Sequence, residues 1–397
     1  MKSFWLVAVS TMTASAVAMA QSTVTLYGVI DESLLVSTNS NGGRVLRLSD
    51  NGIRGNRIGL IGTEDLGDGK AAIFRLENGF NATTGSMGQG GRLFGSQALV
   101  GVTGNSGTVL AGRQINTDAS LIAVNFAAAT QWAGVLAAHP GDVDNLYDTF
   151  RVPGALKYIA PKIGGFDFQA LYAPGGVAGN GPRAQVASAA VSYSLGQIAI
   201  GASYSSAQTP NLGLAAGTAN ANTVTVPPGA NYTSPVDSGF SSAHAYQVLS
   251  LGASYSSGSV TLGVLYTNTR FRGLGDPSAG PNPLEYTGDA NFHNVELNGR
   301  YSISPALSVG ASYNVTTRNS VSTLHRPEGL GPARYLQAVV GIRYILQKTV
   351  FVYLEAMMQH ASGVDSTGRS AVAANAAVGA SSSAQQSAMR AGLNVSF

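Results

Sequence analysis

The chain has 397 residues, of which 44% are apolar and only 11% are charged, and its formal net charge is +3. Soluble domains usually carry about 25% charged residues, so this composition excludes an ordinary cytoplasmic protein. The mean hydropathy of +0.12 also lies far below that of a bundle of membrane-spanning helices. Because the sequence contains no cysteine, disulfide frameworks, thiolate metal sites and cysteine nucleophiles are excluded as well.

The first twenty residues have the pattern of a secretory signal peptide. Lys2 gives a positive start, and an apolar run follows from Phe4 to Val17. Ala18-Met19-Ala20 then provides the small residues of a cleavage site. A membrane anchor is the alternative, but the run is shorter than the roughly 20 residues that a span needs. We therefore expect residues 1–20 to be removed on export and residues 21–397 to form a single domain.

Past residue 20, short segments alternate in polarity and end at glycine, asparagine, aspartate or serine, which is the pattern of β-strands. In residues 24–31 one face carries valine, leucine and isoleucine, whereas the other carries threonine, tyrosine and aspartate. The same two-sided pattern recurs in residues 57–63, 71–80, 259–270, 291–301 and 334–344. Placing a strand at each such run predicts about sixteen strands.

The predicted connections between these strands alternate between short and long. Short turns are predicted at residues 64–69, 105–106, 162–164, 195–196, 256–258, 304–305 and 347–348. Long connections are predicted at residues 39–51, 81–92, 116–152, 174–185, 207–245, 271–289, 319–333 and 361–385. Residues 207–243 and 369–388 contain almost no charge and are interpreted as loops rather than separate domains. The alternation places all long loops at one end of the sheet, which is typical of an outer-membrane barrel.

Composition and alternation together predict an all-β fold, a 16-stranded antiparallel transmembrane β-barrel in the bacterial outer membrane. Within hydrocarbon every backbone polar group must be paired internally, so strands cross a membrane only as a closed barrel. Lipid then covers the apolar face of each strand and replaces the charged shell of a soluble protein. A barrel of about sixteen strands leaves a water-filled channel instead of a packed interior.

The chain ends in a predicted strand whose last residue is aromatic. Leu393, Val395 and Phe397 share one face of this strand, whereas chain termini are more often frayed and polar. Together with the export signal and the loop alternation, this pattern makes Phe397 the candidate signal for the barrel assembly machinery of the outer membrane.

Three stretches carry a family pattern: residues 21–31 (QSTVTLYGVID), residues 55–67 with 73–80 (GNRIGLIGTEDLG and IFRLENGF), and residues 112–114 (GRQ). They resemble the Gram-negative trimeric general porins, and in particular their beta-proteobacterial, often anion-selective branch. The resemblance implies sixteen strands, a homotrimer in outer-membrane lipid, and a third loop folded into the lumen as a constriction. It also implies passive diffusion of small hydrophilic solutes and ions, without a cofactor.

Basic residues of these strands are the candidate wall of that constriction. Arg57 and Arg75 alternate with apolar neighbours that we expect to face lipid, and an outward arginine at mid-membrane would cost roughly 2–4 kcal/mol. Arg113 shows the same alternation. The resemblance implies that these three arginines belong to the basic wall, with Lys157 as an addition from the strand after the long loop. Related chains often have a second arginine where this one has Ile61, so we expect only weak anion selectivity.

The long connection 116–152 supplies the candidate acidic side of the constriction. Asp142, Asp144 and Asp148 follow a nearly uncharged stretch, and Pro140-Gly141 predicts a turn beside them. A loop of this length inside a compact fold is usually functional. A solvated external turn and a calcium site are the alternatives, although no glutamate follows at the spacing of an EF-hand.

Residues 119–138, within the same connection, carry no formal charge and have the length of a membrane-spanning helix. Polar residues and a glycine interrupt this stretch. We therefore expect it to belong to the third loop, with a short helix packed on the wall of the lumen.

No motif indicates an enzyme, a metal site or a nucleic-acid interface. The sequence has no G-x-S-x-G elbow, and its five histidines lack the paired spacing of a metal site. Sequence order alone does not reveal a serine and a histidine that meet from different strands. Two functions besides general diffusion remain open: a substrate-selective channel, and an adhesin or assembly barrel plugged by its own loop, with its activity in residues 207–245 and 361–385.

Overall fold

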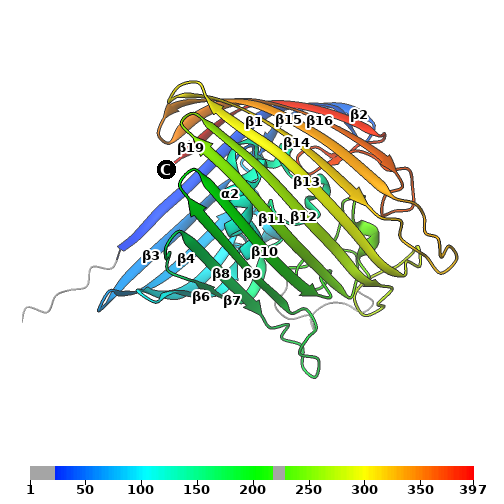
Figure 1. Ribbon diagram of the computed structural model, residues 1–397, viewed down its shortest axis with the longest axis horizontal. Coiled ribbons are helices and arrows are strands. Elements are labelled where there is room, and N and C mark those ends of the chain that lie inside the picture. Colours follow the sequence, from blue (N-terminus) through cyan, green and yellow to red (C-terminus); the bar gives the residue numbers. More distant parts are fainter. Residues whose placement is uncertain (1–22, 218–228) are drawn as a thin grey trace, which may run out of the picture.

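A sheet of antiparallel strands closes on itself in the computed structural model, which describes residues 23–217 and 229–397 (Figure 1). The strands are β1(Thr23–Ser40), β2(Gly43–Asp50), β3(Arg57–Gly67), β4(Lys70–Gly79), β5(Gln97–Gly104), β6(Gly107–Gln114), β7(Val152–Ile159), β8(Phe166–Ala173), β9(Val186–Leu195), β10(Ile198–Gln208), β11(Ala245–Ser257), β12(Val260–Leu274), β13(Gly288–Ser302), β14(Leu307–Arg318), β15(Ala333–Gln347), β16(Val350–Gly363) and β19(Gln385–Ser396). A separate hairpin consists of β17(Ala374–Asn375) and β18(Gly379–Ala380). Strand β1 pairs with β19 and closes the barrel. The predicted signal peptide, residues 1–20, lies outside the described residues.

The 17 strands of the sheet fill the 16 positions predicted for the barrel, because β2 and β3 lie one after the other along β1. The predicted long connection 39–51 is therefore wrong. A tight turn at Asn41-Gly42, with φ of 51° and 95°, joins β1 directly to β2. The break in the strand that pairs with β1 comes later, at residues 51–56, between β2 and β3. In β2 the exposed leucines alternate with polar residues, but this alternation covers too few residues to be distinguished from a loop.

The prediction of long loops at one end and short turns at the other is confirmed for the other connections (Figure 1). The long connections comprise residues 80–96, 115–151, 174–185, 209–217 with 229–244, 275–287, 319–332 and 364–384. Short turns such as Asp68-Gly69, with φ of 53° and 70°, join the strands at the other end. The N-terminal end of β1 and the C-terminal end of β19 both lie on the short-turn side, as predicted.

Most of the residues that face outward from the barrel are apolar. In β1, the side chains of Leu26, Ile30 and Leu34 are exposed, whereas Asp31 and Ser33 between them are buried toward the lumen. Exposed aromatic side chains gather near the short turns, as in the girdle that marks a membrane interface: Tyr158, Phe166, Tyr255, Tyr301, Tyr344 and Phe397. The two faces of each strand therefore meet two different solvents, as the sequence pattern predicts.

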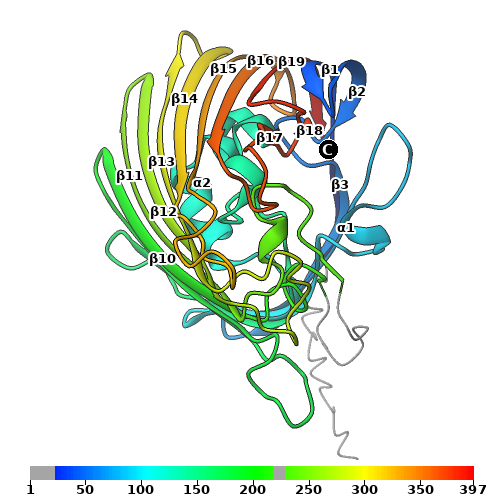
Figure 2. The same ribbon diagram turned by 90° about the vertical axis from the view of Figure 1, so that its right-hand side faces the viewer.

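The loop 115–151, between β6 and β7, lies inside the barrel (Figure 2). It contains the short helices η1(Asp118–Ala123), α2(Val124–Phe126), η2(Ala129–Ala133), η3(Gly134–Ala137) and η4(Pro140–Asp142). Phe126 and Trp132 of this loop lie against inward positions of the wall that carry no side chain: Gly201, Gly252, Gly310 and Gly341. A Cβ at Gly201, Gly252 or Gly310 would collide with one of the two rings, and a Cβ at Gly341 would lie 3.2 Å from the ring of Trp132. Glycines on four strands thus make the room in which the loop packs.

No single helix among the described residues is long and apolar enough to cross a membrane. Within the loop, the helical stretches Asp118–Phe126 and Ala129–Ala137 are bent by 83° relative to each other. The uncharged stretch 119–138 is thus a bent part of the loop, in contact with the inner wall.

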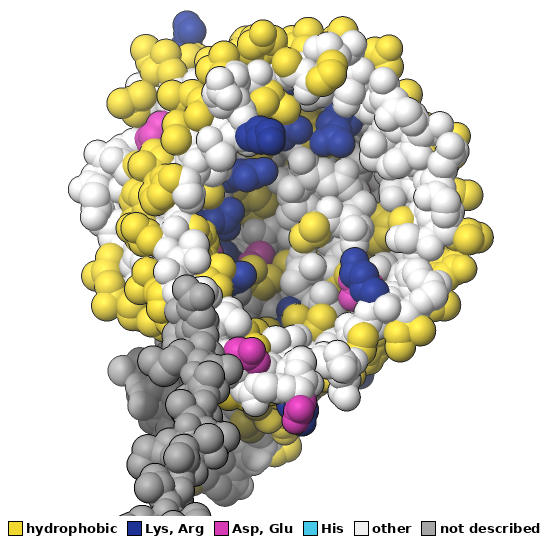
Figure 3. All heavy atoms as spheres, turned by 90° about the vertical axis from the view of Figure 1, so that its left-hand side faces the viewer, with side chains coloured by type: hydrophobic (Ala, Val, Ile, Leu, Met, Phe, Trp, Pro, Cys, Tyr) yellow, Lys and Arg dark blue, Asp and Glu magenta, His cyan; other side chains and the backbone are white. Residues whose placement is uncertain are grey.

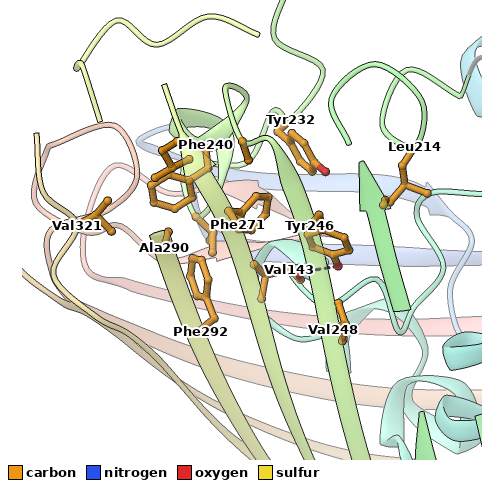
Figure 4. Packing of buried hydrophobic residues seen from close by; sticks show 14 of the residues in the cluster. Val143, Leu214, Tyr232, Phe240, Tyr246, Val248, Phe271, Ala290, Phe292 and Val321 are labelled. Atoms are coloured by element: carbon orange, nitrogen blue, oxygen red, sulfur yellow. Dashed lines mark hydrogen bonds between the residues drawn. The ribbon is translucent and has the colours of Figure 1, made fainter. Parts of the chain in front are cut away.

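A cluster of buried aromatic side chains fills the barrel beside β12 and β13, toward the long loops (Figure 4). Phe240, from the connection between β10 and β11, lies 5.5 Å from the ring centroid of Phe271 and 6.1 Å from that of Phe292. The guanidinium carbon of Arg318 lies 5.6 Å from the Phe240 ring centroid. Because this side of the lumen is packed, the open space lies on the other side, near β2 to β4.

The glycine face gives a direct test of how the loop 115–151 is held. Gly252→Val would place methyl groups in the space of the Phe126 ring, and such overpacking typically costs about 1–3 kcal/mol. We expect the loop to detach while the barrel stays folded, so that limited proteolysis cuts within residues 115–151. The control is Ala253→Val, which adds bulk to the outward face of the same strand. Equal cleavage of both variants would contradict this packing.

Candidate functional site

The open space inside the barrel is a cavity of about 1320 Å³ between the strand wall and the loop 115–151. The charged residues that line it include Arg47, Arg54 and Arg57 on the side of the wall, and Asp142, Asp148 and Arg151 on the side of the loop. Seen from the short-turn end, lysine and arginine side chains gather along one wall of the opening (Figure 3). Basic and acidic groups therefore face the same water-filled space.

Two of the predicted basic residues lie on the lumen faces of neighbouring strands. Arg57 begins β3 and lines the cavity. Arg75 of β4 pairs in register with Ile61 of β3, which places it on the same face but closer to the short turns. The sequence predicted both orientations, because an uninterrupted strand fixes the face of every residue once one face is known.

Arg113 lies at the end of β6, where the pairing with β7 shifts register between Gly112 and Gln114. On its other side it pairs with Ala98 of β5, on the outward face of that strand. Its guanidinium Nε donates a hydrogen bond to the carbonyl oxygen of Gly95 at 2.7 Å, and Nη1 donates to that of Gly217 at 3.4 Å. The side chain thus holds two loop segments and does not line the cavity.

Lys157, the fourth predicted basic residue, points inward from β7 and is only 5% exposed. Its Nζ donates hydrogen bonds to the carbonyl oxygen of Ile115 at 3.2 Å and to Oγ of Ser120 at 2.7 Å. Both partners belong to the loop 115–151. Lys157 therefore fastens the start of this loop to the wall.

The three predicted aspartates of the loop separate into two environments. Asp142 and Asp148 line the cavity. Asp142 accepts hydrogen bonds from the backbone N–H groups of Tyr147 and Thr149, at 2.9 and 3.1 Å, and Asp148 pairs with Arg151 at 2.8 Å. Asp144 is only 1% exposed and lies behind them, against the strand wall.

Asp144 belongs to a buried ionic latch of three residues, which we define as His139, Asp144 and Glu296. His139 Nδ1 lies 2.6 Å from Asp144 Oδ2, and His139 Nε2 lies 3.1 Å from Glu296 Oε2 on β13. Thr267 of β12 also donates a hydrogen bond to Asp144, at 2.7 Å. Burial disfavours the charged imidazolium, but the two carboxylates outweigh it and raise the pKa of His139 well above its usual value. The latch therefore ties the loop to β13.

Further arginines that the sequence pattern did not indicate lie on the wall around Phe351 of β16. The guanidinium carbons of Arg54 and Arg343 lie 5.8 and 5.3 Å from the ring centroid of Phe351, and Arg300 borders the same part of the wall. Strand alternation would have identified Arg300 and Arg343, because both occupy inward positions of predicted strands. Arg54 follows the break after β2, where no alternation exists to reveal it.

The inward carboxylates of the strands are engaged by neighbouring side chains, whereas the arginines are freer. Glu77, Glu296, Glu355 and Asp31 each accept hydrogen bonds from side chains. Within the described ranges, Arg54, Arg57 and Arg343 form no ion pair with a carboxylate. These three arginines therefore contribute positive charge to the lumen that no carboxylate pairs with directly.

Burial changes the protonation of the acidic side of the cavity. It raises the pKa of Asp142 to about 6, with a further contribution from the charge of Asp144. It also raises the pKa of Asp148 to about 7, although Arg151 opposes the increase. Both carboxyls therefore lose their negative charge as the pH falls through 7 and 6. Arginines keep their positive charge throughout this range.

The part of the chain that the structure describes contains no group of three or more histidine, aspartate or glutamate side chains placed to hold a metal ion. The aspartates at 142, 144 and 148 have the partners given above and do not converge on one point.

Comparisons with known sequences agree with this geometry. The Gram-negative porin family matches residues 6–320 of the chain. An outer membrane porin protein of Bordetella pertussis is 35% identical over 167 residues, or 38% of this chain and 42% of that protein. Outer membrane porin protein 32 of Delftia acidovorans is 34% identical over 169 residues, or 41% of this chain and 47% of that protein. The matches thus span less than half the length of these curated relatives.

Solved structures share the fold over nearly the whole chain. The anion-selective porin from Comamonas acidovorans has a TM-score of 0.68 and 19% identity, and the match covers 95% of this chain and 100% of that one. The trimer form of OmpT, an outer membrane protein of Vibrio cholerae, has a TM-score of 0.60 and 15% identity, with 95% and 99% covered. These similarities confirm the predicted barrel.

The raised pKa values predict a pH-dependent ion preference of the lumen. Between about pH 8 and about pH 5, neutralisation of Asp142 and Asp148 should shift the reversal potential in a salt gradient toward anions. The double variant Asp142→Asn with Asp148→Asn should show the low-pH preference at every pH. A pH response in this variant as large as in the wild type would contradict the assignment.

The arginines beside Phe351 predict a second effect on ion preference. Arg54→Gln with Arg343→Gln removes two positive charges from the wall and should move the reversal potential toward cations, without a change in the strand pairing. Arg270→Gln with Arg334→Gln is the matched control, because it removes two positive charges from the outward face. The same shift in the control would show that the lumen position is irrelevant.

Proposed function

The chain belongs to the Gram-negative porin family, and from this premise we propose that it forms a water-filled channel for passive diffusion of small hydrophilic solutes and ions across the outer membrane. The observation that carries the proposal is the cavity inside a closed barrel, with arginines on one side and aspartates on the other. Its apolar outer wall suits a membrane, whereas its lumen suits water.

Opposite charges on the two sides of the cavity determine which solutes pass through the channel. Arg57 on the wall and Asp148 on the loop create a field across the path, which favours polar solutes. Apolar solutes gain nothing from the field and must displace ordered water. Because selection depends on distributed charge, we propose general diffusion and no enzymatic activity.

We propose a weak preference for anions within this function. The arginines of the wall lack ion pairs among the described residues, whereas strand carboxylates such as Glu77 and Glu355 are held by neighbours. The predicted wall residues Arg75, Arg113 and Lys157 extend the same positive field, although the last two also fasten loops. Asp142 and Asp148 limit the preference while they are ionised.

We propose a homotrimer in the membrane, with the contact surface at β1 and β2. Glu32 and Asp50 lie directly opposite each other on the outward face of these strands, between exposed leucines. Charged groups on a lipid-facing wall are destabilising, so a second copy that covers them removes this cost. The trimeric form of a structure with the same fold supports this arrangement.

We also propose that Phe397 takes part in assembly by the barrel assembly machinery. Its ring is 57% exposed on the outer wall and lies against Gly28, while its backbone exchanges two hydrogen bonds with that residue. The aromatic end of the last strand is thus accessible at the seam where β19 meets β1. We also propose that residues 1–20 are removed on export.

Recordings in planar lipid bilayers test the channel function. The purified protein should produce ohmic conductance steps that do not saturate with salt concentration, and strong voltage should close each inserted trimer in three equal steps. Heat-denatured protein is the control. A silent barrel would contradict the channel, and saturable block by one solute would favour a substrate-selective channel instead. If each inserted oligomer closed in a single step, this result would contradict the trimer but not the channel.

A further inference from the structure

One part of the outward face carries polar and basic side chains where lipid-facing aliphatic residues would be expected. These residues lie on β12, β13 and β15, toward the long loops: Asn268, Arg270, Arg272, Asn291, His293 and Arg334. We define them as the external cationic row. Arg270, Arg272, His293 and Arg334 are exposed at the surface.

Strand register places the row on the outside of the barrel and makes its members neighbours. Arg270 pairs with Asn291, and Asn268 pairs with His293. His293 pairs with Thr317, which in turn pairs with Arg334. Along β13 the row shares its face with lipid-exposed Val295, Leu297 and Tyr301. Its members therefore lie on three of four neighbouring strands, with Thr317 of β14 between His293 and Arg334.

The height of the row agrees with the edge of the membrane. Asn291 and Tyr301 are ten residues apart on β13, and Tyr301 belongs to the aromatic girdle near the short turns. Ten residues of antiparallel strand extend about 34 Å, which corresponds to roughly 26 Å of height at a tilt of about 40°. The apolar band of such barrels is about 25 Å tall. The row thus lies at the level of the head groups in the external leaflet.

Hydrogen bonds hold the row in place. Asn268 donates to Oδ1 of Asn291 at 2.6 Å, and Arg270 Nε donates to Oδ1 of Asn268 at 3.0 Å. His293 lies 3.1 Å from the Asn291 amide and 2.8 Å from the hydroxyl of Tyr266 on its other side. These contacts orient Arg270 while leaving its terminal nitrogens at the surface. Asn268, Arg270, Asn291 and His293 therefore form one connected group within the row.

The row carries positive charge that the protein itself does not neutralise. Arg272 lies 3.7 Å from Asp289, a loose and exposed pair. Within residues 23–217 and 229–397, neither Arg270 nor Arg334 forms an ion pair. Guanidinium groups bind phosphate oxygens through paired hydrogen bonds. An anionic group at head-group height would complete this surface.

We propose that the external cationic row binds the phosphate groups of a phosphorylated lipid in the external leaflet. The acyl chains of this lipid would lie on the aliphatic band below, against residues such as Val295 and Leu297. Its phosphates would lie over Arg270 and Arg334, which are on either side of His293. The row thereby holds lipid against this part of the outer wall and contributes nothing to the lumen.

Binding of diphosphorylated lipid A to the detergent-extracted oligomer, measured by native mass spectrometry, tests the proposal. Arg270→Gln with Arg334→Gln should lower the affinity by about tenfold or more. The matched control is Lys70→Gln with Lys348→Gln, which removes the same charge at the short-turn end and should leave the affinity unchanged. Channel conductance should stay the same in both double variants.

Equal losses of affinity in the two double variants would overturn the proposal, because they would indicate attraction by net charge alone. A second measurement needs no variant: the wild-type protein is titrated with the same lipid after enzymatic removal of its phosphates. Undiminished binding of the dephosphorylated lipid would overturn a phosphate site, even where the arginine variant fails to fold.

Discussion

The barrel depends on one requirement: within a membrane, every backbone N–H and C=O group must pair inside the protein. Antiparallel strands meet this requirement once β1 pairs with β19 and closes the sheet. Closure gives each strand one face toward lipid and one toward the lumen, so the alternation of the sequence follows from two solvents. The low content of charged residues has the same origin, because lipid covers the outer wall. Long loops are then free to vary, because the membrane constrains only the strands.

What fills the lumen is determined by a second set of interactions. Inward glycines such as Gly252 and Gly310 leave space for Phe126 and Trp132, so the loop 115–151 packs on the wall as a side chain packs in a core. The buried latch around His139 adds a directional constraint, because both carboxylates need that imidazolium as a partner. Packing on one side of the barrel therefore leaves the water-filled path on the other. The cavity owes its position to this asymmetry.

The sequence was sufficient for everything that depends on strand alternation. It predicted the barrel, the two kinds of connection and the lumen orientation of Arg57 and Arg75, because a strand fixes the face of each residue. It failed where alternation is short or interrupted: the connection 39–51 proved to be a hairpin, and Arg113 lies at a register shift. It also could not separate Asp144 from its neighbours, since burial against Thr267 and His139 arises only when distant segments meet.

Strand β15 shows how one segment can serve two environments. Arg334 and Arg343 are nine residues apart, an odd number, so the period of two places them on opposite faces. Arg343 stacks on Phe351 inside the lumen, where its charge acts on solutes in water. Arg334 lies outside, near the long loops, where the apolar band ends and head groups begin. Arginine thus has two roles on this strand. Which role applies depends on the face of the strand that the residue occupies and on its height in the membrane. A shift of one residue in register would exchange these environments, which makes the pairing of β15 with β14 and β16 a condition for both.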